Sequence, residues 1–236
     1  MRINKFLAKT GLASRRQSEN LVIQGKIEIN GVVIEDLSTQ VDIENDEVTY
    51  QGKVLELPSE SKVIAINKPK GYLCTQFDPQ QRETIYELIP KPLQHLHYIG
   101  RLDYQSRGLL LLTDDGELSR RLTHPEFEIP RYYLVTLNHE LDVESKVKLE
   151  AGLLLDDGTQ FRPAKVKVFG KKVEMRLVEG KKREIREMMH ALDYKVKDLQ
   201  RVSYASIELD DLEEGQWRVL SVEEVDELYN SVELTK

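Results

Sequence analysis

One aspartate, Asp103, stands just before a run of four leucines in the stretch GRLDYQSRGLLLLTDDGEL, residues 100–118. Arg101 lies two residues before it. A cation near a carboxylate favours the ionised form, and an ionised carboxylate in a mostly dry pocket can attack carbon covalently. The same two residues could also form a structural salt bridge in a surface turn. Their spacing alone leaves both interpretations open.

Other reactive side chains lack the partners that their chemistry needs. His95 and His97 share one face of a predicted strand, but no cysteine or acid at a useful spacing completes a metal site. The acidic pairs at 114–115 and 156–157 are typical of turns and do not follow the calcium-loop pattern. No P-loop, dinucleotide-binding glycine pattern or G-x-S-x-G motif occurs. We therefore expect no metal and no cofactor.

The composition allows one large domain or two smaller ones in 236 residues, with 40% apolar residues to build a core. The formal net charge of -7, from 34 basic and 41 acidic residues, argues weakly against a nucleic-acid partner. However, the acids are concentrated late in the chain, and the bases lie early and in KKREIR. A basic face is therefore compatible with the acidic total.

Membrane and export signals are absent from the sequence. No window approaches a run of 18 apolar residues, and the amino terminus MRINKFLAKTGLASRRQ has no signal-peptide apolar stretch. Cys74 is the only cysteine, which excludes an internal disulfide. These features favour a reducing cytoplasm. We expect a monomer that does not contact a membrane.

The first sixty residues have the signals of a separate module. Residues 14–17 have the spacing of a capping box, which predicts a helix over 15–24. A shorter helix is predicted over 4–10, and each helix should end at a glycine. Asn30-Gly31 is a strong hairpin-turn signal, and residues 57–61 are predicted to be a linker.

Basic residues gather in this module, with few acidic neighbours before Glu19. Three of them are spaced three and four residues apart, so they should share a helix face. A solvated surface is the ordinary explanation for such a charge run, and an RNA-binding face is the alternative. The residues of that face would be Arg2, Lys5, Lys9, Arg15, Arg16 and Lys26.

The remainder of the chain is richer in strands than in helices. Strands are predicted at residues 63–66, 95–99, 131–137, 166–168 and 173–178. A helix is predicted over 182–194, where apolar residues have i, i+3, i+4, i+7 spacing. Strands and helices do not alternate regularly, which indicates an α+β domain on a mixed, largely antiparallel sheet.

The stretch GRLDYQSRGLLLLTDDG resembles the signature of the pseudouridine synthases that modify ribosomal RNA, the RsuA/RluB type. INKPKGYLCT upstream, then RYYLV, EGKKREIREMM and LQRVSYASIEL, follow the order of that family. The amino-terminal pattern resembles the S-four type RNA-binding module. The resemblance covers nearly the whole chain. It implies a small αα-β RNA-binding domain over residues 1–60, followed by a pseudouridine synthase catalytic domain over 61–236.

The resemblance implies a role for each matched residue of the catalytic domain. Asp103 matches the nucleophilic aspartate, and Arg186 matches the basic residue that pairs with it. Tyr133 matches the tyrosine that stacks on the target base near its carbon 5. Ile185 matches the apolar residue that lines the pocket. Arg101 would help to keep Asp103 charged.

Three positions depart mildly from the family pattern. Ser106 replaces the commoner threonine and keeps the hydroxyl, and Arg131 replaces a frequent lysine and keeps the charge. Glu184 stands where many members have glutamine. This last departure leaves the RNA target open, and the expected reaction stays the same.

The implied reaction is the isomerisation of a specific uridine to pseudouridine in ribosomal RNA. The bond from the ribose to nitrogen 1 breaks and the base is rejoined through carbon 5, without a cofactor. The uridine must first leave its stack. Ribosomal RNA, free or in a subunit precursor, is the expected partner, with the large subunit slightly preferred over the small one. The alternatives are the same chemistry on transfer RNA, or a non-catalytic RNA-binding or ribosome-assembly protein.

Overall fold

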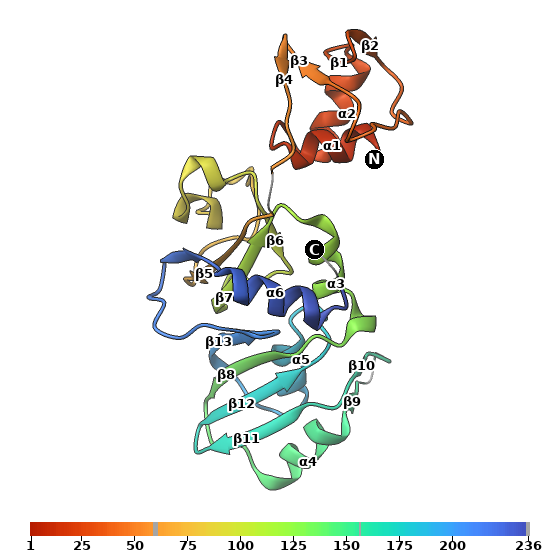
Figure 1. The fold of residues 1–236 in the computed structure, drawn as a ribbon. Coiled ribbons are helices and arrows are strands. Elements are labelled where there is room, and N and C mark those ends of the chain that lie inside the picture. The colour runs from red at the N-terminus through yellow and green to blue at the C-terminus, as the bar shows by residue number, and fades with distance from the viewer. Residues whose placement is uncertain (59–60, 156, 235–236) are drawn as a thin grey trace. The chain divides into compact units, whose positions relative to one another are not determined.

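The protein was analysed as a computed structural model that describes residues 1–58, 61–155 and 157–234 (Figure 1). The chain divides into two compact units. The first consists of Met1–Lys62 and Pro92–Leu96, and the second of Val63–Lys91 and His97–Lys236. In the part of the chain that the structure describes, no helix is long and apolar enough to cross a membrane.

The first unit packs two helices on a small antiparallel sheet with the strand order β2-β1-β3-β4. Its elements are α1 (Ile3–Lys9), α2 (Arg15–Ile23), β1 (Ile27–Ile29), β2 (Val32–Ile34), β3 (Val48–Tyr50) and β4 (Lys53–Val54). Its core contains Ile3, Leu7, Val22 and Ile27, each fully buried. The two helices and the hairpin were expected from the sequence.

The predicted capping box and the predicted hairpin turn of this unit are both present in the structure. The side chain of Ser14 accepts a hydrogen bond from the amide of Gln17, and the side chain of Gln17 accepts one from the amide of Ser14. Asn30 and Gly31 both have positive φ, 51° and 76°, as a type I′ hairpin turn requires. The predicted linker at 57–61 falls partly on residues 59 and 60, which lie outside the described residues.

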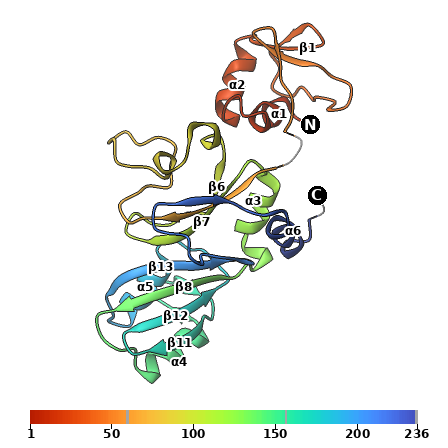
Figure 2. The same ribbon diagram turned by 60° about the vertical axis from the view of Figure 1, so that its left-hand side comes forward.

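The second unit is built on a nine-stranded sheet (Figures 1 and 2). Its strands are β5 (Val63–Lys68), β6 (His97–Ile99), β7 (Arg107–Thr113), β8 (Arg131–Leu137), β11 (Lys165–Phe169), β12 (Lys172–Leu177), β13 (Val196–Tyr204), β14 (Ile207–Glu208) and β15 (Trp217–Val219). The order is β11-β12-β8-β13-β7-β5-β15, with β14 on β13 and β6 on β7. Only β7 and β13 are parallel among the strand pairs described, which confirms the expected mixed, largely antiparallel sheet.

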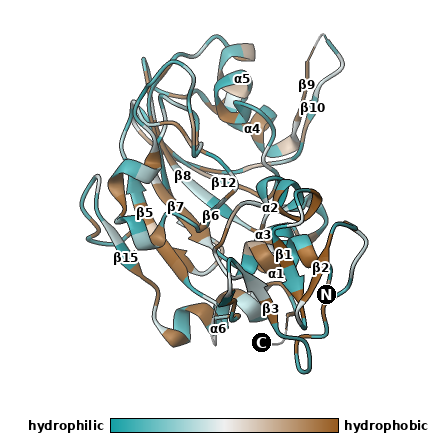
Figure 3. Cartoon of the chain, turned by 90° about the horizontal axis from the view of Figure 1, so that it is seen from above, coloured by the Kyte–Doolittle hydropathy of each residue, from teal (hydrophilic) through white to brown (hydrophobic). Residues whose placement is uncertain are grey.

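Helices cover the two halves of this sheet. They are α3 (Gly116–Thr123), α4 (Val143–Ala151), α5 (Glu184–Ala191) and α6 (Val222–Ser231), with 3-10 turns η1 (Ile85–Leu88), η2 (Lys91–Leu93) and η3 (Pro125–Phe127) and a small hairpin β9 (Leu153–Leu154) and β10 (Gln160–Phe161). Helices α3 and α6 pack with β5 and β7 in one core, and α4 and α5 pack with β8 and β12 in another. The hydrophobic residues of β7 are prominent in Figure 3.

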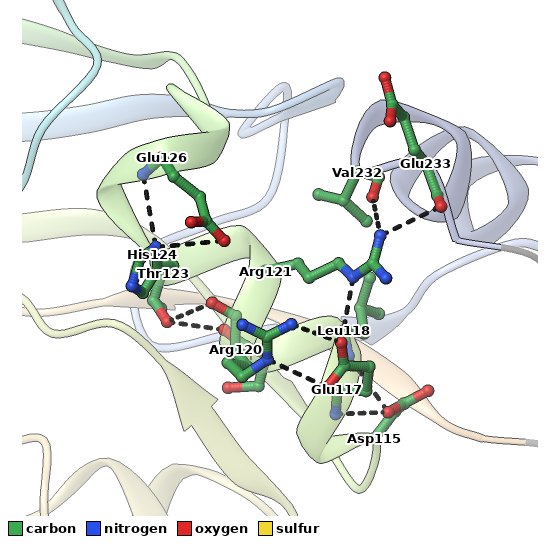
Figure 4. Close-up of polar contacts among 11 residues, drawn as sticks. Asp115, Glu117, Leu118, Arg120, Arg121, Thr123, His124, Glu126, Val232 and Glu233 are labelled. Carbon is green, nitrogen blue, oxygen red and sulfur yellow. Dashed lines mark hydrogen bonds and ion pairs between the residues drawn. The ribbon is translucent and has the colours of Figure 1, made fainter.

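Helix α3 is fixed at both ends by polar contacts (Figure 4). The side chain of Asp115 accepts hydrogen bonds from the amides of Glu117 and Leu118, which caps the helix. Arg121 donates to the carbonyl oxygens of Val232 and Glu233, just after α6. Thr123, the last residue of α3, lines the cavity described next.

Candidate active site

A cavity of about 300 Å³ opens in the second unit beside the loop that precedes β7. Its walls come from residues 100–106, from β8, from residues 177–185 and from β13. It brings together four residues that the sequence singled out: Asp103, Arg101, Tyr133 and Ile185. These residues come from three separate parts of the chain, so the sheet topology assembles the site.

Asp103 lies half-buried in the loop between β6 and β7. Its backbone carbonyl oxygen accepts a hydrogen bond from the amide of Ser106 at 3.0 Å, which closes a tight turn. No donor among the described residues forms a hydrogen bond or an ion pair with its carboxylate. Hydrogen bonding therefore fixes the backbone of Asp103, and its carboxylate can contact a ligand in the cavity.

The side chain of Lys68 holds this turn through hydrogen bonds. Lys68 ends β5, all six residues of which are buried, and its own exposed fraction is 0%. Its ammonium donates to the carbonyl oxygens of Pro69 at 2.9 Å, Asp103 at 3.2 Å and Ser106 at 2.8 Å. Burial lowers the pKa of Lys68 to about 8. The sequence analysis did not select Lys68, although a lysine that ends an apolar run such as VIAINK is a visible signal.

The glycine of the signature has a steric role. Gly108 pairs with Arg201 where β7 and β13 run parallel, and its φ is +106°. A Cβ atom on Gly108 would lie 2.2 Å from the carbonyl oxygen of Arg201. Only glycine allows the two backbones to approach this closely, and that approach places Arg201 next to the cavity.

Arg186 does not form the expected ion pair with Asp103 among the described residues. Its guanidinium donates to the carbonyl oxygen of Gln105 at 3.0 Å and reaches the hydroxyl of Ser106 at 3.4 Å. Burial and the nearby Arg183 lower the pKa of Arg186, and the charge of Asp103 opposes this shift. A third, longer hydrogen bond of 3.5 Å goes to the carbonyl oxygen of Val196. Arg186 thus holds the turn that carries Asp103 through Gln105 and Ser106, and does not contact the carboxylate.

Tyr133 and Ile185 both line the cavity. Tyr133 is half-buried in β8, opposite Met175 of β12 and Arg201 of β13. Ile185, 3% exposed, lies in the first turn of α5 and also belongs to the core beneath the sheet. An aromatic ring and an aliphatic side chain give the cavity apolar surface on which a planar base can rest.

Two arginines that the sequence analysis did not select as site residues form the buried part of the cavity. Arg131 and Arg201 are 7% and 2% exposed, and each guanidinium lies 4.9 Å from the ring centroid of Tyr204. Arg131 donates to the carbonyl oxygens of Leu122 and Glu179, and Nε of Arg201 donates to that of Leu109 at 2.7 Å. Neither forms an ion pair with any described carboxylate. These two buried guanidinium groups give the cavity positive charge in its interior.

Arg101 lies at the exposed edge of the cavity. No ion pair joins it to Asp103 in the described part of the chain. The direct arginine contacts with the Asp103 carboxylate that the resemblance implied are therefore absent among the described residues.

The six basic residues of the first unit lie at its surface. Arg2 precedes α1, and the others lie on or near the two helices and β1. Four are exposed besides Arg2, and Lys9 is half-buried. Within the described ranges none of the six forms an ion pair with an acidic side chain. Their positive charge is therefore available to a partner.

Comparisons with known proteins agree with this arrangement. The family model described as RNA pseudouridylate synthase matches residues 62–191, and the S4 domain model matches residues 1–48. An RNA pseudouridine synthase of Aquifex aeolicus (strain VF5) is 37% identical and covers 99% of this chain and 96% of its own length. Ribosomal large subunit pseudouridine synthase B of Bacillus subtilis (strain 168) is 34% identical, with coverage of 96% and 95%.

A crystal structure of a pseudouridylate synthase superposes with a TM-score of 0.70 at 33% identity, and covers 97% of this chain and 99% of that one. The chain belongs to the RNA pseudouridylate synthase family. It is a pseudouridine synthase, an isomerase, with an amino-terminal S4 domain of the RNA-binding type. The family and the fold class expected from the sequence are confirmed.

Proposed function

We propose that this enzyme converts a specific uridine of large-subunit ribosomal RNA to pseudouridine, with Asp103 as the nucleophile. The observation that carries the assignment is the Asp103 carboxylate, which faces the cavity and makes no hydrogen bond or ion pair among the described residues. A carboxylate that served only as a structural ion pair would have a cation in contact. An anchored backbone with a free carboxylate is what nucleophilic attack needs.

The other cavity residues have distinct roles in this proposal. Tyr133 stacks on the uracil, and Ile185 supports it from the apolar side. Arg131 and Arg201, whose side chains are buried, supply positive charge to the base and to Asp103. Arg101, at the exposed edge, is placed to meet the RNA backbone.

The reaction is an isomerisation in which all atoms are retained. The bond from C1′ of the ribose to N1 breaks, a bond from C1′ to C5 forms, and the proton of C5 is lost as N1 gains one. The uridine must leave its stack to reach a cavity of this size, at a cost of a few kcal/mol. Stacking on Tyr133, worth about 1–3 kcal/mol per base, offsets part of that cost.

Ribosomal RNA is favoured as the substrate by two features. The Bacillus subtilis relative is named for the ribosomal large subunit and matches nearly the whole chain. The surface cations of the first unit, which lack acidic partners in the described ranges, suit a structured RNA that is held by its backbone. An enzyme that acts on this substrate would work in the cytoplasm. Small-subunit ribosomal RNA and transfer RNA are the alternative substrates.

The test combines a variant with a map of modified positions. Pseudouridines are mapped in ribosomal and transfer RNA from cells with the gene, without it, and with Asp103→Asn. We expect one large-subunit position to lose its modification in both mutant strains, and Asp211→Asn, an exposed control, to restore it. Retention of about a tenth of wild-type turnover by purified Asp103→Asn enzyme would remove Asp103 from the nucleophile role. A lost position in small-subunit or transfer RNA would instead overturn the substrate.

A further inference from the structure

Two buried glutamates stand at the ends of the loop that forms one wall of the cavity. Glu179 follows β12 and is 6% exposed, and Glu184 begins α5 and is 5% exposed. Residues 180–183 between them, called here the basic loop, all line the cavity. The sequence of the basic loop is GKKR, so it carries three positive charges to the edge of the site.

The basic loop has a conformation that needs external support. Arg183 has a φ of 54°, in the left-handed region that non-glycine residues rarely adopt. The carboxyl group of Glu184 accepts a hydrogen bond from the amide of Lys181 at 3.0 Å, and the amide of Glu184 donates to the carbonyl oxygen of Lys181. Glu184 therefore closes the loop on itself.

Glu179 fixes the other end. Its carboxylate accepts the amide of Arg162 at 2.7 Å and pairs with the ammonium of Lys181 at 3.1 Å. The carboxyl groups of Glu179 and Glu184 both contact Lys181, Glu184 through the amide and Glu179 through the ammonium, and each carboxyl group shifts the pKa of the other through hydrogen bonding. Oε1 of Glu184 is buried and receives no hydrogen bond from any described donor. Two carboxyl groups can bond to each other only if one of them carries a proton.

We propose that Glu179 and Glu184 share one proton at neutral pH, and that this carboxyl–carboxylate bond is the positioning element that holds the basic loop against the substrate. The inference rests on the proposed function for its catalytic consequence, but not for the shared proton itself. Neither glutamate is assigned to the reacting atoms.

The surroundings favour the proton on Glu184. Burial, together with the hydrogen bond to Glu179 and the charge of Glu179, raises the pKa of Glu184 to about 8. Burial would also raise the pKa of Glu179, but the hydrogen bonds from Arg162, Glu184 and Lys181 outweigh it and the pKa is lowered. The charged groups around the pair are Lys181, Arg131, Arg162 with its partner Glu128, and Arg183 with its partner Glu187.

The raised pKa of Glu184 determines how the stability of the folded chain changes with pH. Between about pH 4.5 and 8, Glu184 is protonated in the folded chain and ionised in the unfolded one. The folded state then binds more protons, so this group makes the protein less stable as the pH rises through that window. Above about pH 8 both carboxyl groups ionise, repel each other, and release the basic loop.

The decisive variant is Glu184→Gln, which supplies a permanent donor to Glu179 and cannot ionise. Urea unfolding of wild type and variant is compared from pH 5.5 to 7.5, without RNA. We expect the ratio of their unfolding equilibrium constants to change by up to about tenfold per pH unit, with the variant gaining stability relative to wild type. Glu187→Gln, on the same helix and paired with Arg183 at the surface, should show no such trend.

Turnover is then measured from pH 6.5 to 9 on the RNA that supports it. We expect wild-type kcat to fall as the pH passes about 8, Glu184→Gln to lack that fall, and Glu184→Ala to be slow throughout. If the free energies of unfolding of wild type and Glu184→Gln changed in parallel with pH, the proposal of a shared proton would be wrong. If the predicted difference in stability appeared but wild type and Glu184→Gln had identical pH–rate profiles, the pair would not position the basic loop for catalysis. Absence of wild-type turnover on ribosomal RNA would instead contradict the proposed function, and the unfolding comparison would still decide the shared proton.

Discussion

The ammonium of Lys68 lies 3.2 Å from the carbonyl oxygen of Asp103 and 2.8 Å from that of Ser106, so one buried cation closes both ends of the turn that carries the proposed nucleophile. The cation is the last residue of a fully buried strand. The position of Asp103 is therefore tied to the core of the sheet, although Asp103 itself lies in a loop.

Lys68→Met is expected to lower both stability and turnover. The substitution keeps the length of the side chain but removes the ammonium donor from the carbonyl oxygens of Pro69 and Ser106, and leaves that of Asp103 with only the amide of Ser106. The loss should cost about 1–3 kcal/mol for each group left without a donor that water does not reach. The free energy of unfolding in urea and kcat measure the two effects. Lys70→Met, whose ammonium pairs with Asp198 at 39% exposure, is the matched control and should cost no more than about 1 kcal/mol. Unchanged kcat in Lys68→Met would show that the turn holds its own geometry.

Arg186→Met is expected to reduce kcat by about tenfold to a hundredfold while the protein stays folded. The loss corresponds to hydrogen bonds from a charged donor, worth about 1.5–3 kcal/mol, that hold Gln105 and Ser106 in place. Arg186→Lys keeps the charge but cannot present the planar fork to both acceptors, so it should recover only part of the rate. Full recovery with lysine would mean that the charge near Asp103, and not the geometry of the turn, is what matters.

Tyr133→Phe is expected to bind RNA as well as wild type does and to form product more slowly. The ring, which supplies the stacking energy in the proposed reaction, is retained, and only the hydroxyl, which we propose acts near the proton on carbon 5, is lost. Tyr133→Ala should weaken binding by about 1–3 kcal/mol, because it removes the ring. Titration of binding and single-turnover assays on the same RNA separate the two effects. Equal single-turnover rates for Tyr133→Phe and wild type would exclude a role for the hydroxyl.

Arg16→Gln is expected to weaken RNA binding and to reduce its dependence on salt. Each lost contact with a phosphate should lower the slope of log K against log salt by about one unit or slightly less. Lys53→Gln removes an equally exposed charge from β4 in the same unit and should leave the slope unchanged. Binding titrations at several salt concentrations give the comparison. If both variants have the wild-type slope, the basic face of the first unit is only a solvated surface.

Local signals in the sequence were sufficient for much of the secondary structure. The capping box at Ser14 and the Asn30-Gly31 turn agree with the structure because each depends on interactions within a few residues of the chain. The predicted bounds of β8 agree as well. The α+β class and the family likewise followed from motifs that can be read in order. The predicted helix over 182–194 is shorter, at Glu184–Ala191, because residues 181–184 form the closed turn that supports the basic loop.

Only the tertiary structure decided which groups surround Asp103. Lys68 and Arg201 bond to carbonyl oxygens that lie 35 and 92 residues away along the chain, and no local pattern specifies such contacts. The parallel pairing of β7 with β13 brings Arg201 to the cavity, and it explains why glycine is needed at position 108. The sequence selected the proposed site residues by their types and motifs. Their charge state and partners depend on burial, which arises only when distant strands pack together.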